Sequence, residues 1–230
     1  VYPGATEEIC VPVLERASKK IYNKDFFCGY SPERINPGDK ERRLPNIKKI
    51  TSGSTPDVAQ IVDDLYGQII VAGTHKATSI AVAEAAKVIE NTQRDINIAL
   101  INEFTQLCSA TGINVQEVID AASSKPYGFM PFRPGVGIGG HCIPVDPLYL
   151  TWWARKGGQV ASLVERSDEI ANKMPIYVAE RALALTKGSI GTPKVLILGV
   201  AYKPGVGDVR GQDLEGRQWY RPPKRTGDDF

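Results

Sequence analysis

The chain has 230 residues, enough for one large domain or two small ones, and an ordinary apolar content of 42%. Its 28 basic and 26 acidic residues are well mixed, and the net charge of +2 gives no electrostatic reason to expect nucleic acid or an anionic membrane surface as partner. No apolar run approaches the ~20 residues of a membrane helix, and the four cysteines lack metal-site spacing. We therefore expect a cytoplasmic protein with no metal and no nucleic-acid or membrane partner.

The first third of the chain alternates short apolar runs with helical segments, which predicts a parallel α/β sheet. A helix is expected over 7–20, interrupted near its start by Pro12, which cannot donate a backbone hydrogen bond. A second helix is expected to begin at 54–57, where a hydroxyl cap, a proline and an acidic residue follow one another. The apolar runs that we interpret as strands are 26–30, 47–51 and 69–72.

The middle of the chain predicts one long helix. Residues 78–110 contain no proline or glycine, and a helix of that length spans about 50 Å. Gly112 should end it, and Asn114 with Glu117 fits a capping box for the next helix, up to Ala122.

The last hundred residues mix irregular and helical segments. Residues 125–147 are too rich in glycine and proline for regular structure. Helices are expected from 148 and over 162–185, the second broken at Pro175. A buried strand over 194–199 should open a new α/β domain, and 211–230 is expected to be disordered.

The glycine-rich segment at 135–147 is the most informative part of the sequence. Its glycines at 135, 137 and 140 match Gly-x-Gly-x-x-Gly, but no strand precedes them and prolines follow, which argues against a dinucleotide site. We interpret it instead as a loop whose backbone approaches a ligand and which presents Cys142, with Asp146 four residues on. The other three cysteines have apolar neighbours in sequence and are expected in the core.

The long helix carries a second set of polar residues. Glu84, Lys87, Asn91 and Arg94 line one face, because their spacings match the helical repeat. Such a stripe is usually a solvated face, and the buried stripe would then consist of Ile89, Ile96, Leu100, Phe104 and Leu107. Lys87 and Asn91 could instead donate to a developing oxyanion. Glu33 follows an expected strand, where α/β active sites collect.

Three stretches together resemble the UDP-glucose/GDP-mannose dehydrogenase family. They are Tyr-Ser-Pro-Glu-Arg-Ile-Asn-Pro-Gly at 30–38, Glu-Ala-Ala-Lys-Val-Ile-Glu-Asn at 84–91, and Gly-Ile-Gly-Gly-His-Cys-Ile-Pro-Val-Asp at 137–146. The resemblance covers roughly residues 1–210. Lys-x-x-x-Asn is shared with the β-hydroxyacid dehydrogenases, so Gly-Gly-x-Cys-x-Pro-x-Asp is the specific element.

The resemblance implies an α/β fold with a remnant of a Rossmann-like parallel sheet, a long connecting helix and an all-helical central domain. The start of a second Rossmann-like domain would follow. The implied parts are the end of an NAD-binding domain (1–76), a central helical dimerisation and catalytic domain (77–187), the start of a UDP-sugar-binding domain (188–210) and the tail (211–230). A homodimer through the long helix is also implied.

The resemblance further implies oxidation of a sugar C6 alcohol to a carboxylate, with two NAD consumed per sugar. Cys142 would form a thiohemiacetal and then a thioester, because a thiolate traps an aldehyde. Lys87 and Asn91 would stabilise oxyanions, Asp146 would position water and Lys87, and Glu33 would act as acid/base or substrate ligand. The implied substrate contacts are Tyr127, Arg133, Gly137, Lys203 and Arg210.

The residues around Glu33 and Cys142 look more like the N-acetylhexosamine branch of the family, with UDP-N-acetylglucosamine as first choice of substrate and UDP-N-acetylmannosamine as second. The family begins with a strand and Gly-x-Gly-x-x-Gly that hold NAD, whereas this chain opens on Val-Tyr-Pro-Gly. We therefore expect an internal fragment, and no cofactor-binding residue is assigned. The alternative is a non-catalytic fragment that keeps only the dimerising core; a β-hydroxyacid dehydrogenase is third, and Cys142 argues against it.

Overall fold

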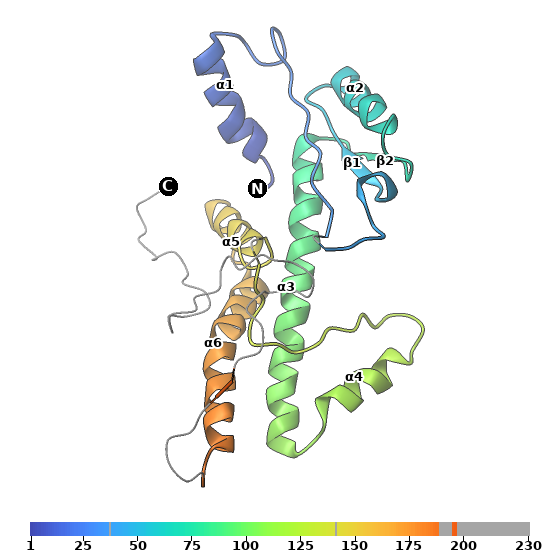
Figure 1. Ribbon diagram of the computed structural model, residues 1–230. Coiled ribbons are helices and arrows are strands. Elements are labelled where there is room, and N and C mark those ends of the chain that lie inside the picture. The colour runs from blue at the N-terminus through green and yellow to red at the C-terminus, as the bar shows by residue number, and fades with distance from the viewer. Residues whose placement is uncertain (37, 141, 189–194, 197–230) are drawn as a thin grey trace. The chain divides into compact units, whose positions relative to one another are not determined.

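The computed structural model describes residues 1–36, 38–140, 142–188 and 195–196, which form two compact units. The first unit comprises Val1–Thr92 and Tyr149–Val160. The second comprises Gln93–Leu148 and the residues described from Ala161 onward. The long helix α3 (Ile80–Thr111) contributes residues to both units (Figure 1).

The first unit contains the predicted parallel α/β arrangement. Strands β1 (Lys49–Thr51) and β2 (Thr74–Lys76) pair in parallel, with Ile50 opposite His75. Helix α2 (Pro56–Gly67) connects them and begins as predicted, because the Thr55 hydroxyl accepts a hydrogen bond from the Val58 N–H at 3.3 Å. Ile50, Ala77 and Ala83 form a small core beside the sheet, with Tyr30 and Ala86 packed against it.

Two of the predicted strands are wrong. Over 26–30 the chain makes only isolated bridges, one of them between Gly29 and Gly53, because neighbouring glycines and turns interrupt a ladder there. The run 69–72 forms turns after α2: the N–H groups of Ile69 and Ile70 both donate to the Tyr66 carbonyl. Val71 is 86% exposed, so this apolar run closes a helix instead of entering the sheet.

The predicted N-terminal helix forms in two pieces. Residues Thr6–Cys10 (η1) make one wide π turn, and α1 (Val11–Ser18) follows. Pro12 lies at the junction, where it cannot donate to the carbonyl four residues earlier, and the Val11 N–H reaches the Thr6 carbonyl five residues back. The predicted interruption is therefore a widened turn in a continuing helix.

Helices α3 and α4 begin and end where sequence signals predict. Gly112 has φ +74°, and the Ile113 N–H donates to the Cys108 carbonyl at 2.9 Å, which closes α3 with a Schellman motif. Helix α4 (Val115–Ser123) starts at the predicted cap, because the Asn114 side chain accepts from the Gln116 N–H at 3.0 Å. Asn114 also donates to the Glu117 carboxylate at 2.8 Å, so the two predicted residues meet through their side chains and not through the backbone bonds of a capping box.

The last two helices are α5 (Asp146–Lys156) and α6 (Ser162–Leu185), both expected. Within the second unit α6 runs parallel to the second half of α3 (Figure 1), joined by a 2.6 Å hydrogen bond from Ser167 to Asp95. Pro175 lies inside α6 without ending it, so the predicted break is not seen. The preceding residue, Met174, is buried, and its sulfur lies 3.3 Å from the Gln106 side-chain nitrogen on α3.

The C-terminal half of α5 is held within the first unit. The Tyr2 and Trp152 rings lie 4.8 Å apart, and Lys156 pairs with Glu8 at 2.5 Å. A short 3₁₀ turn, η2 (Leu44–Asn46), precedes β1. The predicted strand at 194–199 and the tail at 211–230 lie outside the described residues, except for 195 and 196. Among the helices described, none has both the length and the apolar character needed to cross a membrane.

Candidate active site

Helix α3 presents its polar stripe toward the protein rather than toward water. Glu84 is fully buried and Asn91 is only 6% exposed, while Lys87 is partly buried. The Glu84 carboxylate accepts hydrogen bonds from the N–H groups of Gly4 (2.6 Å) and Thr6 (2.9 Å), and so holds the start of the first helix. The interpretation of this stripe as a solvated face is therefore wrong for these three residues, whereas Arg94, the last of the stripe, is exposed.

The apolar residues that were expected to form the buried stripe lie mostly on the outside. Ile89, Leu100 and Leu107 are each about 60% exposed, and Phe104 is 37% exposed. The physical reason is that the polar residues of α3 are needed inside, where they accept hydrogen bonds from other segments. The apolar face is left without cover among the described residues.

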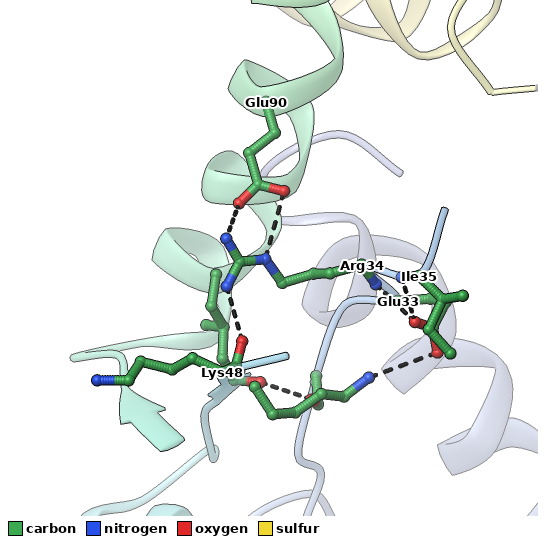
Figure 2. Close-up of polar contacts among 8 residues, drawn as sticks. Glu33, Arg34, Ile35, Lys48 and Glu90 are labelled. Carbon is green, nitrogen blue, oxygen red and sulfur yellow. Dashed lines mark hydrogen bonds and ion pairs between the residues drawn. The ribbon is translucent and has the colours of Figure 1, made fainter. Parts of the chain in front are cut away.

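The Glu33 side chain is held by the backbone of the loop in which it lies (Figure 2). One carboxylate oxygen accepts from the N–H groups of Arg34 and Ile35, both at 2.7 Å, and the other lies 3.6 Å from Lys49 Nζ. Partial burial alone would raise the Glu33 pKa. The hydrogen bonds and the Lys49 charge outweigh it and hold that pKa below its ordinary value. Glu33 is therefore poised as an ionised acceptor.

Cys142 is exposed and lies in the turn that leads into α5, four residues before the helix begins at Asp146. Its carbonyl accepts from the N–H groups of Val145 (3.1 Å) and Asp146 (2.8 Å), so a tight turn leads from the cysteine into the helix. Asp146 is the first residue of α5 and is half-buried. Of the three cysteines expected in the core, Cys108 is buried as predicted and Cys28 is half-buried, but Cys10 is exposed, so that prediction is wrong for Cys10.

The loop before Cys142 is irregular, as predicted, but it is tied to two helices of the second unit. Arg133 donates to Gln116 (2.7 Å) and Asp120 (2.6 Å) of α4. The Gly135 N–H donates to the fully buried Asn102 of α3 at 3.0 Å. Elsewhere in the loop, the Tyr127 ring is 72% exposed and stands under the Lys125 ammonium group.

The glycines of this loop serve different purposes. Gly139 and Gly140 have φ of +64° and +79°, a conformation that favours glycine. A Cβ at Gly137 would meet nothing within 4 Å, so the described fold does not itself require glycine there. The segment 135–140 has no strand before it, which supports the rejection of a dinucleotide fingerprint.

A cavity of about 350 Å³ opens where the two parallel strands end. Its lining includes Gly53–Thr55 after β1 and Ala77–Ser79 after β2, together with Glu7 and Lys76. Ligands of open α/β sheets bind at this end of the strands.

The family follows from comparison with known proteins. Residues 81–173 match the central domain of the UDP-glucose/GDP-mannose dehydrogenase family. The chain is 54% identical over 213 residues to a UDP-N-acetyl-D-glucosamine 6-dehydrogenase of Pseudomonas aeruginosa, covering 91% of this chain and 50% of that protein. This chain belongs to the UDP-glucose/GDP-mannose dehydrogenase family. With the same coverage it is 48% identical to Protein CapL of Staphylococcus aureus.

Solved structures of nucleotide-sugar dehydrogenases share the fold. The UDP-N-acetyl-mannosamine dehydrogenase of Staphylococcus aureus is 33% identical, with a TM-score of 0.75 over 91% of this chain and 48% of that one. The Pyrococcus horikoshii UDP-D-ManNAc dehydrogenase is 32% identical, with a TM-score of 0.74 over 81% of this chain and 43% of that one. The chain thus spans about half the length of the relatives it matches.

The structure places the predicted site residues of this family member in two groups. Lys87, Asn91 and Glu33 belong to the first unit; Cys142, Asp146, Tyr127, Arg133 and Gly137 belong to the second. Lys203 and Arg210 lie outside the described residues.

Several residues that organise these groups were missed by the sequence analysis. Arg34 and Lys49 fix the loop of Glu33, and Asn102 fixes the loop before Cys142. Arg34 follows Glu33 in the family motif at 30–38, so the sequence offered a reason to assign Arg34 to the site. Lys49 and Asn102 gave none, because only the fold brings them to their partners.

Proposed function

We propose that this polypeptide carries the catalytic cysteine of an NAD-dependent UDP-N-acetylhexosamine 6-dehydrogenase, with UDP-N-acetylglucosamine as the preferred sugar. The observation that carries the proposal is the exposed Cys142, which follows the glycine-rich segment 135–140 and begins the tight turn into α5. Relatives of this chain support the same sugar class, since they include a UDP-N-acetyl-D-glucosamine 6-dehydrogenase and a UDP-N-acetyl-D-mannosamine dehydrogenase.

The proposed chemistry removes four electrons from the sugar C6 in two steps. In the first step the alcohol loses a hydride and a proton to give an aldehyde. The Cys142 thiolate then adds to that aldehyde, and loss of a second hydride converts the thiohemiacetal to a thioester. Water cleaves the thioester, which releases the carboxylate and restores the thiol. NAD would supply the acceptor for both hydrides.

Lys87 and Asn91 are proposed to stabilise the oxyanions that form at C6. A partly buried ammonium group and a buried amide on adjacent turns of a rigid helix suit that role, since preorganised donors cost no reorganisation during the reaction. Lys87 makes no ion pair with another described residue, which leaves its charge available. Asp146 is proposed to position the hydrolytic water and Lys87.

For Glu33 the geometry favours one of the two roles expected from the sequence. A carboxylate whose pKa is held below its ordinary value remains ionised at neutral pH. It is therefore a better hydrogen-bond acceptor for a sugar hydroxyl than a general acid. We accordingly propose Glu33 as a substrate ligand.

The proposed substrate contacts are Tyr127, Arg133 and Gly137, with Lys203 and Arg210 from the later part of the chain. The exposed Tyr127 ring and the open space at Gly137 leave room for a nucleotide-sugar to approach the backbone. Arg133 already bonds to α4, so its contribution would be to shape the loop while its remaining donors face the ligand.

We also propose that two copies of the chain pair through α3. Leu100, Phe104 and Leu107 follow one another at spacings of four and three residues, which places them on one face of the helix. All three are exposed among the described residues. Burial of such a face against a second copy would remove apolar surface from water.

The test is NADH formation by the purified chain with NAD and each of three sugars: UDP-N-acetylglucosamine, UDP-N-acetylmannosamine and UDP-glucose. The proposal predicts the highest kcat/KM with UDP-N-acetylglucosamine. A folded chain that forms no NADH with any of them would contradict the activity and favour the non-catalytic fragment. Preference for UDP-glucose would contradict the sugar class.

A further inference from the structure

A single arginine joins the loop of Glu33 to the long helix (Figure 2). Arg34 Nη2 lies 2.7 Å from Glu90 Oε1, and its Nε lies 3.4 Å from the other Glu90 oxygen. A third donor, Nη1, reaches the Lys48 carbonyl at 2.7 Å, just before β1. The guanidinium group thus contacts α3 and the strand segment at once, and all these residues belong to the first unit.

The backbone of Arg34 also binds the carboxylate of the preceding residue, Glu33. The Arg34 backbone N–H donates to the Glu33 carboxylate at 2.7 Å, next to the equivalent bond from Ile35. The orientation of the Glu33 carboxylate therefore depends on where the backbone at 34 and 35 lies. That backbone is held in place by the side chain of Arg34.

Glu90, the partner of Arg34 on α3, lies close to the two proposed catalytic residues of that helix. Glu90 lies three residues after Lys87 and immediately before Asn91. A helix transmits position along its length with little distortion, so fixing Arg34 to Glu90 also fixes the loop relative to the helical turns that carry Lys87 and Asn91. Lysine could not replace arginine here, because the planar guanidinium group directs two donors to Glu90 and a third to the Lys48 carbonyl.

We propose that Arg34 is a positioning residue for Glu33, which it holds against the stretch of α3 that carries Lys87 and Asn91. The catalytic meaning of this position rests on the proposed function. The pair is partly exposed, at 29% and 37% for the two side chains. A pair of that kind contributes little to global stability, typically about 0–1 kcal/mol, so its effect should be local.

The test measures amide hydrogen exchange by NMR in the full 230-residue chain. Arg34→Lys and Glu90→Gln should each speed exchange of the amides at 34 and 35 about threefold to fivefold, because local opening becomes easier. The reversed pair, Arg34→Glu with Glu90→Arg, should recover part of the protection. The matched control is Arg166→Lys, which alters another ion-paired arginine, bound to Glu103 and Glu169, and should leave these amides unchanged.

Parent exchange rates at 34 and 35 in both single variants would overturn the proposal. The amide of the buried Val88 on α3 serves as reference, since unchanged exchange there shows that the helix itself is intact.

Turnover gives a separate measurement. Arg34→Lys should lower kcat/KM for the sugar about tenfold, with KM rising more than kcat falls, because the misplaced carboxylate is a substrate ligand. A kcat/KM equal to the parent's would overturn the positioning role. A parent chain that forms no NADH counts against the proposed function alone, and the exchange result then decides this inference by itself.

Discussion

The buried carboxylate of Asp95 should make the stability of the second unit depend on pH. Asp95 is 3% exposed and faces α6, where Ser167 donates to it at 2.6 Å. Desolvation raises its pKa from the ordinary 3.8 to about 6; the nearby Asp168 adds to the rise and the Ser167 hydrogen bond opposes it. Keeping Asp95 ionised at neutral pH therefore costs roughly 3 kcal/mol of unfolding free energy.

The sign of the effect follows from proton binding. Between pH 4 and 6 the folded chain binds a proton at Asp95 that the unfolded chain releases, so this contribution to stability falls as pH rises. Asp95→Asn removes the charge and can still accept from Ser167. The variant should be more stable than the parent at pH 7.5, by up to about 3 kcal/mol, and nearly equal to it at pH 4.

The assay is urea unfolding of both proteins from pH 4 to 8. Because the other titrating groups are common to both, their effects cancel in the difference. Glu180→Gln is the matched control, since it neutralises an exposed carboxylate on the same helix α6 and should change stability by less than about 0.5 kcal/mol at every pH. A difference for Asp95→Asn that is independent of pH would refute the reasoning.

Three further results are expected. Gly137→Ala should keep the parent urea midpoint but lower turnover about tenfold or more, because the space beside Gly137 is open. Gly140→Ala should lose about 1–2 kcal/mol of unfolding free energy, because residue 140 has φ +79°. Equal losses of stability in the two variants would show that the fold itself constrains Gly137. Replacing Leu100 and Phe104 by aspartate should convert a dimer to monomers in sedimentation velocity, and a persisting dimer would exclude that face. Glu33→Gln should be less stable than the parent above the ordinary pKa of 4.5, with the difference vanishing as pH falls through the lowered folded-state pKa; a constant difference would contradict that lowered pKa.

Local signals in the sequence predicted much of the helical structure. The length of α3 followed from an unbroken run of helix-forming residues, and its end at Gly112 followed from the conformational freedom of glycine. The cap at Asn114 and the start of α2 at Pro56 were equally local, since a few neighbouring residues decide them.

The failures concern long-range contacts. Strand expectations failed at 26–30 and 69–72 because pairing depends on distant partners rather than on apolar character. The orientation of α3 could not be predicted either, since Glu84 is buried for hydrogen bonds to residues 78 and 80 positions away. At the site, motifs identified Glu33 and Cys142, but the contacts of Arg34 with Glu90 and of Asn102 with Gly135 exist only after folding.

The most direct test of the central claim counts NADH molecules formed per sugar consumed, with UDP-N-acetylglucosamine limiting and NAD in excess. The parent chain should form two, because in the proposed mechanism the second hydride leaves a thiohemiacetal on Cys142. Cys142→Ala should form at most one, while Cys10→Ala, which removes a different exposed thiol, should still form two. Two NADH per sugar from Cys142→Ala at the parent's rate would contradict the account.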